Sequence, residues 1–274
     1  MEARKDRFQL VGVSGCSGSA GVAAAMACGI PYAIVEAALK RFSGDAIFGL
    51  SGLATPNIIQ WLRSGLKGPF TGFFRGKPYR DVLHQVLGDR TFEDCKIPLE
   101  IPAFNVSTGE VVVFVRGRHS LVKVSRASAA QPGAVEAESG VDVDHPEHHF
   151  VDAGLVDPFP FSFLDTVKYD RLLLQVNDAV KPYAMPDLLT APWTFFRLVI
   201  QVLAGPYRLR MQEDSRAILK QAQDAGIPAQ LALRTAHAPT FTWTPQDMLN
   251  TAEDAFRNVG AILDNPGILS GSRD

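Results

Sequence analysis

The chain has 274 residues, of which 46% are hydrophobic and 20% are charged, a balance typical of a globular protein with enough apolar residues for a core. A formal net charge of −2 gives no electrostatic reason to expect nucleic acid as a partner, which would need a basic face. The three cysteines follow no regular spacing, which argues against a disulfide framework or a zinc site and favours a reducing compartment.

The sequence contains no pattern typical of a signal peptide or a transmembrane helix. Residues 1–7 are charged, and the apolar run that follows is too short for the hydrophobic region of a signal peptide. No apolar stretch reaches the roughly 18 residues that a spanning helix needs. We expect a cytoplasmic protein whose contact with membranes is at most peripheral. We also expect one domain over residues 1–274, because no linker marks a boundary.

The predicted elements alternate between strands and helices. A strand over residues 8–13 meets a glycine- and serine-rich turn, and small residues then predict a helix that ends at Gly29. Further helices are expected over residues 31–42, 57–66, 78–87, 120–130, 192–204, 206–225 and 245–263. Strands are expected over 97–104 and 110–115, which form a hairpin, and over 150–152, 169–176 and 230–234, with loops over 68–76 and 136–149. This order predicts an α/β fold, a layered α/β/α domain with a central, mostly parallel sheet.

The turn after the first strand is similar to a nucleophile elbow, G-x-S-x-G, with serine in the last position: Gly15-Cys-Ser17-Gly-Ser19. The strand and the helix cross closely in such a turn, so the neighbours of the serine must be small. The N-terminus of the helix then favours developing negative charge. We predict Ser17 as the nucleophile, with Ser14 and Ser19 as alternatives. A phosphate-binding turn has the same context, but its G-x-G-x-x-G spacing is absent.

Four segments carry a resemblance in the same order along the chain: residues 15–29, 87–109, 125–132 and 151–160. Together they resemble the patatin-like phospholipase family, the last through Val151-Asp-Ala-Gly154, which is similar to the D-G-G/A motif of that family. The resemblance implies a dyad in which Ser17 is the nucleophile and Asp152 is the base. It also implies Gly15, Gly18 and Gly154 as oxyanion or binding residues. The alternative for Asp152 is an ordinary turn or helix-cap aspartate.

The resemblance implies hydrolysis of the carboxylic esters of lipids, with a lipid or other ester as substrate and no metal or organic cofactor. The family's glycine-rich oxyanion loop, G-G-G-x-R/K-G, is not found before Ser17, so we expect the first β-α unit to be lacking. Truncation is the explanation we favour, and natural loss or a donor from a loop near residues 49–52 are the others. Loss of one oxyanion donor costs about 10²–10³ in rate. A catalytically weak or inactive lipid-binding homologue is therefore the competing function.

Other residues have more than one interpretation. A Ser-His-Asp triad would need a histidine, for which His237 is the candidate. Residues 145–149, His-Pro-Glu-His-His, could bind a metal but are interpreted as a solvated loop, so no metal site is predicted. Arg126 is either a ligand of lipid phosphate or part of a structural ion pair. Several aromatic residues could contact acyl chains or a membrane, although core packing is the simpler explanation: Phe70, Phe73, Phe74, Trp193, Phe195 and Phe196.

Overall fold

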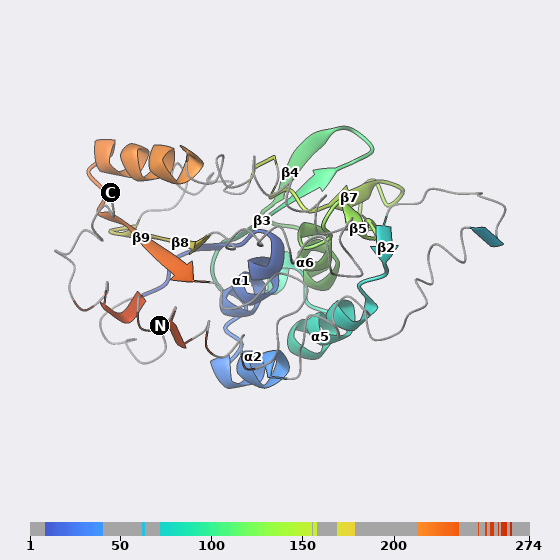
Figure 1. Cartoon of the computed structure of the whole chain (residues 1–274), viewed down its shortest axis with the longest axis horizontal. Coiled ribbons are helices and arrows are strands. Elements are labelled where there is room, and N and C mark those ends of the chain that lie inside the picture. The colour runs from blue at the N-terminus through green and yellow to red at the C-terminus, as the bar shows by residue number, and fades with distance from the viewer. Residues whose placement is uncertain are drawn as a thin grey trace, which may run out of the picture. The chain divides into compact units, whose positions relative to one another are not determined.

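The computed structural model describes residues 9–40, 62–63, 72–154, 156–157, 169–178 and 213–235, with nine further residues between 246 and 264. The chain divides into two compact units, Met1–Val167 and Lys168–Asp274, whose elements are labelled in Figure 1. One domain over the whole chain stays a prediction. The helix expected over 192–204 lies outside the described residues, and within 57–66 only Leu62 and Arg63 are described, both helical.

The first unit contains a five-stranded mixed sheet. Its strands are β1 (Val13–Ser14), β3 (Leu99–Asn105), β4 (Glu110–Phe114), β6 (Glu138–Ser139) and β7 (His149–Val151). They follow the order β1-β3-β7-β6, with β4 also paired to β3. Strand β1 is parallel to β3, whereas the β3–β4, β3–β7 and β6–β7 pairs are antiparallel. The prediction of a mostly parallel sheet is wrong here, because short turns and loops connect several of these strands and reverse the chain.

Four helices of the first unit are where the sequence predicts them. They are α1 (Ala20–Ala27), α2 (Tyr32–Leu39), α5 (Lys77–Leu87) and α6 (Leu121–Ser128). Helix α6 begins after Ser120, whose hydroxyl accepts a hydrogen bond from the backbone N–H of Lys123, as an N-cap residue does. Helices α1 and α6 contact each other and strand β3, as Figure 1 shows. Strand β7, which directly precedes Asp152, also contacts β3 and α6, so the elbow and the expected base belong to one core.

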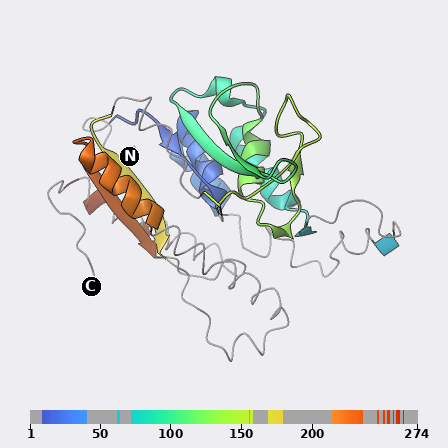
Figure 2. The same ribbon diagram turned by 90° about the horizontal axis from the view of Figure 1, so that it is seen from above.

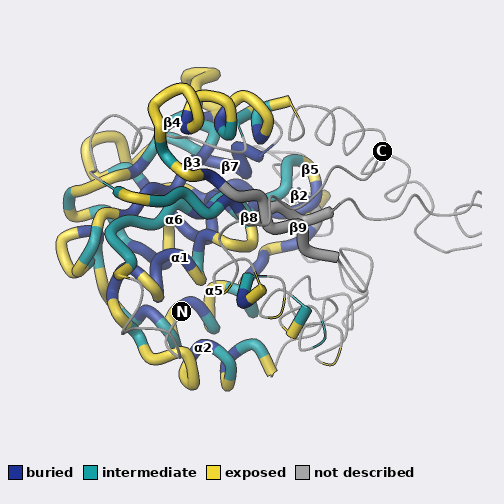
Figure 3. Tube along the Cα trace, turned by 90° about the vertical axis from the view of Figure 1, so that its left-hand side faces the viewer, coloured by how far each residue is buried: buried dark blue, intermediate teal, exposed yellow. Residues whose placement is uncertain are grey.

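Helix α1 is buried through its small residues. Five alanines of this helix are at most 4% exposed: Ala20, Ala23, Ala24, Ala25 and Ala27. Its larger residues Val22 and Met26 are the exposed ones, at 37% each. Figure 3 shows the contrast with α2, most of whose residues are exposed or half-buried. Small side chains allow α1 to approach β3 and α6 closely. Residues on several sides of α1 are therefore buried, and not only those of one apolar stripe.

Two regions expected to be loops contain short strands. Strand β2 (Gly72–Phe74) lies within the 68–76 loop and pairs in parallel with β5 (Gly133–Val135). A Cβ on Gly72 would lie 2.3 Å from the carbonyl carbon of Val135, so this pairing needs glycine. Strand β6 lies within the 136–149 loop. Strands of two or three residues are too short to show alternation in the sequence, so the pattern could not reveal them.

In the second unit, β8 (Leu172–Asp178) pairs in parallel with β9 (Ala229–Thr235) over seven residues of each strand. Residues 213–224 form a helix between them in the chain, and Figure 2 shows the three elements from above. Three residues at helical spacing are buried on this helix, Ser215, Ile218 and Ala222. Parallel pairing with an intervening helix is the βαβ arrangement. The strands expected over 169–176 and 230–234 are confirmed, and most of the helix expected over 245–263 lies outside the described residues.

Candidate active site

Ser17 occupies a strained turn between β1 and α1. It is the first residue of a short 3₁₀ segment, η2 (Ser17–Ser19), and its φ is +58°, the one positive φ at a non-glycine position in the described part of the chain. Residues with a Cβ avoid this left-handed region unless their surroundings hold them there. The nucleophile of an elbow is held in this kind of strained turn. The turn therefore has the backbone geometry that the sequence motif predicts.

The neighbours of Ser17 explain why the turn needs small residues. A Cβ on Gly15 would lie 2.6 Å from the Cβ of Ala23 and 2.9 Å from the carbonyl oxygen of Ser19, so only glycine fits. At Gly18, by contrast, a Cβ would meet nothing within 4 Å. Gly15 is thus required by packing, whereas the role of Gly18 as an oxyanion donor stays a prediction that depends on its backbone amide.

The alternative serines have other roles in the structure. The Ser19 hydroxyl donates to the carbonyl oxygen of Cys16 at 2.7 Å and accepts from the Cys16 N–H at 3.1 Å, so it closes the turn on itself. Ser14 lies in β1, opposite Glu100 of β3. The side chain of Ser17, by contrast, lies near enough to Asp152 to lower the pKa of that carboxylate. Of the three candidates, Ser17 has the contact that nucleophilic activation requires.

Asp152 directly follows β7 and is only 6% exposed. Its N–H donates to the carbonyl oxygen of Ala130 at 2.8 Å, and its Oδ1 accepts from the N–H of Gly154 at 2.8 Å. This second bond is the turn that the alternative interpretation of Asp152 expects, so the residue both forms a turn and contacts Ser17. Gly154 therefore lies beside the carboxylate, and its role as an oxyanion or binding residue stays a prediction.

Burial controls the acidity of Asp152. Removal of the carboxylate from water raises its pKa from 3.8 to about 6, although hydrogen bonds from the Ser17 side chain, the Gly154 amide and the Cys16 side chain lower it. A carboxylate with this pKa is still mainly ionised at neutral pH and is a stronger base than an exposed aspartate. This is the range in which a side chain is effective as a general base.

Three residues near the dyad were missed by the sequence reasoning. The Cys16 Sγ lies 3.9 Å from Asp152 Oδ1, and the Ser128 Oγ accepts a hydrogen bond from the Ser17 N–H at 3.0 Å. Burial, and then the negative charge of Asp152, raise the pKa of Tyr79 on α5. For Ser128 a signal was present, because it belongs to the 125–132 segment. Nothing in the local sequence marks the other two.

Arg126 has the structural role that the sequence left as one of two alternatives. It is 2% exposed and forms an ion pair with Glu138, which is 4% exposed. Its Nη2 also donates to the carbonyl oxygen of Arg75 at 2.6 Å, and Arg80 contacts the same glutamate at 2.7 Å. Since these groups engage both terminal nitrogens of its guanidinium, Arg126 is better explained as a core ion pair than as a phosphate ligand.

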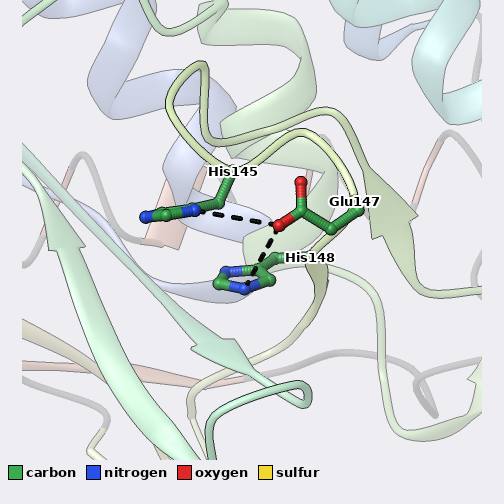
Figure 4. Close-up of side chains that lie close together, drawn as sticks. All are labelled: His145, Glu147 and His148. Carbon is green, nitrogen blue, oxygen red and sulfur yellow. Dashed lines mark ion pairs between the residues drawn. The ribbon is translucent and has the colours of Figure 1, made fainter.

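The histidine-rich loop brings three potential ligand groups together, as Figure 4 shows. Nδ1 of His145 and Nε2 of His148 each lie 3.7 Å from the same oxygen of Glu147. However, the Oδ1 of Asn105 accepts a hydrogen bond from the Ser107 N–H. The amide nitrogen of Asn105 therefore faces His148 and donates to its Nδ1 at 3.1 Å. A neutral His148 then carries its proton on Nε2, where a metal would have to bind. The solvated-loop interpretation is preferred on this ground, and the absence of a metal site stays a prediction.

The remaining candidates are only partly described. His237 lies outside the described residues, so a triad that uses it stays an open alternative. Among the expected aromatic contacts, Phe74 is 8% exposed and belongs to β2, which favours its core interpretation. Nothing is described for the side chain of Phe73, and the other aromatic candidates lie outside the described ranges: Phe70, Trp193, Phe195 and Phe196.

Comparison with known proteins agrees with the geometry. A family model described as patatin-like phospholipase matches residues 4–165, which is more than half of the chain and includes both Ser17 and Asp152. No curated protein sequence shows a significant match. In the ranges that the structure describes, no helix combines the length and apolar character needed to cross a membrane.

Proposed function

The chain belongs to the patatin-like phospholipase family, and from this premise we propose that it hydrolyses carboxylic ester bonds of lipids through a Ser17–Asp152 dyad. The observation that carries the proposal is the pairing of a strained serine with a buried carboxylate. Ser17 has a φ of +58° in the turn after β1, and its side chain lies near enough to Asp152 to lower the pKa of that carboxylate. A serine and a base within hydrogen-bond reach are the minimum that nucleophilic acyl transfer requires.

In the first half of the proposed reaction, the Ser17 oxygen attacks the acyl carbonyl carbon while Asp152 takes the hydroxyl proton. The negative charge then develops on the carbonyl oxygen, where the amide of Gly18 and the N-terminal end of α1 stabilise it. As the tetrahedral intermediate collapses, the ester C–O bond breaks and the leaving alcohol takes the proton from Asp152. The acyl group remains on Ser17.

The second half of the reaction releases the acyl group as a fatty acid. A water molecule donates a proton to Asp152 and attacks the acyl carbon, and the Ser17 oxygen leaves with that proton. Both halves need the same carboxylate in its ionised form, and a pKa of about 6 keeps it ionised at neutral pH. The proposal includes a lipid or other ester substrate, no metal or organic cofactor, a cytoplasmic location with peripheral membrane contact at most, and a three-layer α/β/α fold.

The experiment is an ester hydrolysis assay on the wild type, Ser17→Ala and Ser19→Ala, with p-nitrophenyl butyrate as substrate. We expect Ser17→Ala to lower kcat/KM at least about 10³-fold, because no other group replaces the nucleophile. Ser19→Ala should cost only a few-fold, since its hydroxyl bonds to the backbone of the turn. Equal rates for wild type and Ser17→Ala would rule the dyad out.

A second candidate function is a lipid-binding homologue with little or no turnover. The feature that favours it is the small number of oxyanion donors: among the described residues the amide of Gly18 is the one donor that we propose, and loss of a donor costs about 10²–10³ in rate. This protein would bind phospholipid vesicles equally well as wild type and as Ser17→Ala, while both hydrolyse p-nitrophenyl butyrate at the same low rate. Hydrolysis that depends on Ser17 would exclude this second function.

A further inference from the structure

A buried hydroxyl on α6 contacts the backbone of the elbow. Ser128 is the last residue of α6 and is fully buried, and its Oγ accepts the hydrogen bond of 3.0 Å from the Ser17 N–H. The first N–H groups of a helix have no partner within that helix, so an outside acceptor is needed. Ser128 supplies this acceptor to Ser17, from 111 positions further along the chain.

The same hydroxyl also contacts Cys16. Burial and the charge of Asp152 raise the pKa of the Cys16 thiol, and a hydrogen bond with the Ser128 side chain lowers it. Because Ser128 Oγ accepts the Ser17 N–H, its own proton is free to point to the Cys16 sulfur. The thiol in turn lies 3.9 Å from Asp152 Oδ1. A continuous series of contacts therefore connects the Ser17 amide, Ser128, Cys16 and Asp152.

We propose that Ser128 is a positioning residue for acyl transfer. It holds the Ser17 backbone in its left-handed conformation and, through Cys16, keeps Ser17 next to Asp152. The inference rests on the proposed function and adds to it a residue outside the dyad. The left-handed conformation is costly for serine, so it persists only where contacts fix it. A hydrogen bond to the amide of the strained residue itself is the most direct contact of this kind.

Helix α6 also supplies a matched control. Ser125 lies one turn before Ser128 and is equally buried, at 0% exposed. Its hydroxyl has no hydrogen-bond partner within the described residues. Ser125→Ala and Ser128→Ala thus make the same chemical change at the same depth of the same helix, but only Ser128→Ala removes a contact with Ser17. A general effect of α6 packing would lower the activity of both variants.

The experiment measures kcat and KM for p-nitrophenyl butyrate with both variants, together with their crystal structures. We expect Ser128→Ala to lower kcat about tenfold, the effect of one lost hydrogen bond, and to leave KM within about twofold. Its crystal structure should show Ser17 out of the left-handed region or away from Asp152. Ser125→Ala should match the wild type in both respects. Equal kcat in the two variants, or a rise in KM alone, would overturn the positioning role.

The crystal structures separate this inference from the proposed function. If the wild type hydrolyses no more ester than Ser17→Ala, the proposed function fails. In that case the crystal structure of Ser128→Ala is the only test of the positioning role. A Ser17 backbone in the same conformation as in the wild type would overturn it. If Ser128→Ala does not fold, Cys16→Ala tests the next contact of the series. There, a Ser17–Asp152 contact and a kcat that both match the wild type would count against the proposal.

Discussion

Gly15 and Ala23 approach so closely that a Cβ on Gly15 would lie 2.6 Å from the Cβ of Ala23. This contact joins the end of β1 to the first turn of α1, on either side of Ser17. It leaves no room for a side chain at position 15, where the strand passes the helix. The candidate site thus depends on a packing contact that involves no polar group.

We expect Gly15→Ala to destabilise the protein by roughly 1–3 kcal/mol, because the new methyl group overlaps both Ala23 and the backbone of Ser19. Urea unfolding at neutral pH measures the change. Gly18→Ala is the control, since a Cβ at that position meets nothing within 4 Å, and it should stay within about 0.5 kcal/mol of the wild type. If both variants lose a similar amount of unfolding free energy, the contact between Gly15 and Ala23 is looser than the structure shows.

The raised pKa of Asp152 predicts the pH dependence of hydrolysis. Because the ionised carboxylate is the base, kcat/KM should rise with pH, with an inflection near the pKa of about 6, and then level off. Initial rates with a p-nitrophenyl ester, followed at a wavelength where the product absorbs equally at all pH values, measure this profile. An inflection near pH 4, the range of an exposed aspartate, would contradict the burial of the base.

Stability should depend on the same group. The pKa of Asp152 is raised on folding, so the folded state binds the proton more tightly and loses stability as pH rises from about 4 to about 6. The rise of the pKa from 3.8 to about 6 corresponds to roughly 3 kcal/mol of unfolding free energy. Asp152→Asn does not titrate, so its stability relative to the wild type should increase by about this amount between pH 4 and pH 7. Stability curves of Asp152→Asn and the wild type that stay parallel between pH 4 and pH 7 would contradict the prediction.

The buried ion pair between Arg126 and Glu138 should matter far more than an exposed one. Arg126→Met leaves Glu138 buried with Arg80 as its remaining cationic contact, and we expect a loss of about 3 kcal/mol or more in urea unfolding. Lys220→Met removes an exposed pair with Asp224, at 2.7 Å, and should cost less than about 1 kcal/mol. If Arg126→Met is as mild as Lys220→Met, the structural interpretation of Arg126 is wrong.

The sequence predicted those features that local patterns encode. The small residues around Ser17 predicted the elbow, and the runs on either side of residues 107–109 predicted the β3–β4 hairpin, which the structure confirms. The elbow and the hairpin each depend on residues that are close together in the chain. Glycine positions and the alternation of side chains therefore predict them from the sequence.

The features that the sequence did not predict arise from tertiary contacts. The Ser128–Ser17 hydrogen bond joins residues 111 positions apart. A structural ion pair was one of two alternatives for Arg126, but its buried partner Glu138 was not predicted, because local polarity would place both residues at the surface. Strands β2 and β6 have two or three residues each and gain their pairing only from the folded neighbours. The direction of the strands in the five-stranded sheet likewise depends on connections that no single segment encodes.

The most direct test of the central claim is covalent labelling with a fluorophosphonate, followed by peptide mass mapping. The account predicts one adduct per chain, on Ser17, with labelling abolished in Ser17→Ala and slowed below about pH 6 as Asp152 becomes protonated. An adduct on a different residue, or undiminished labelling of Ser17→Ala, would contradict it.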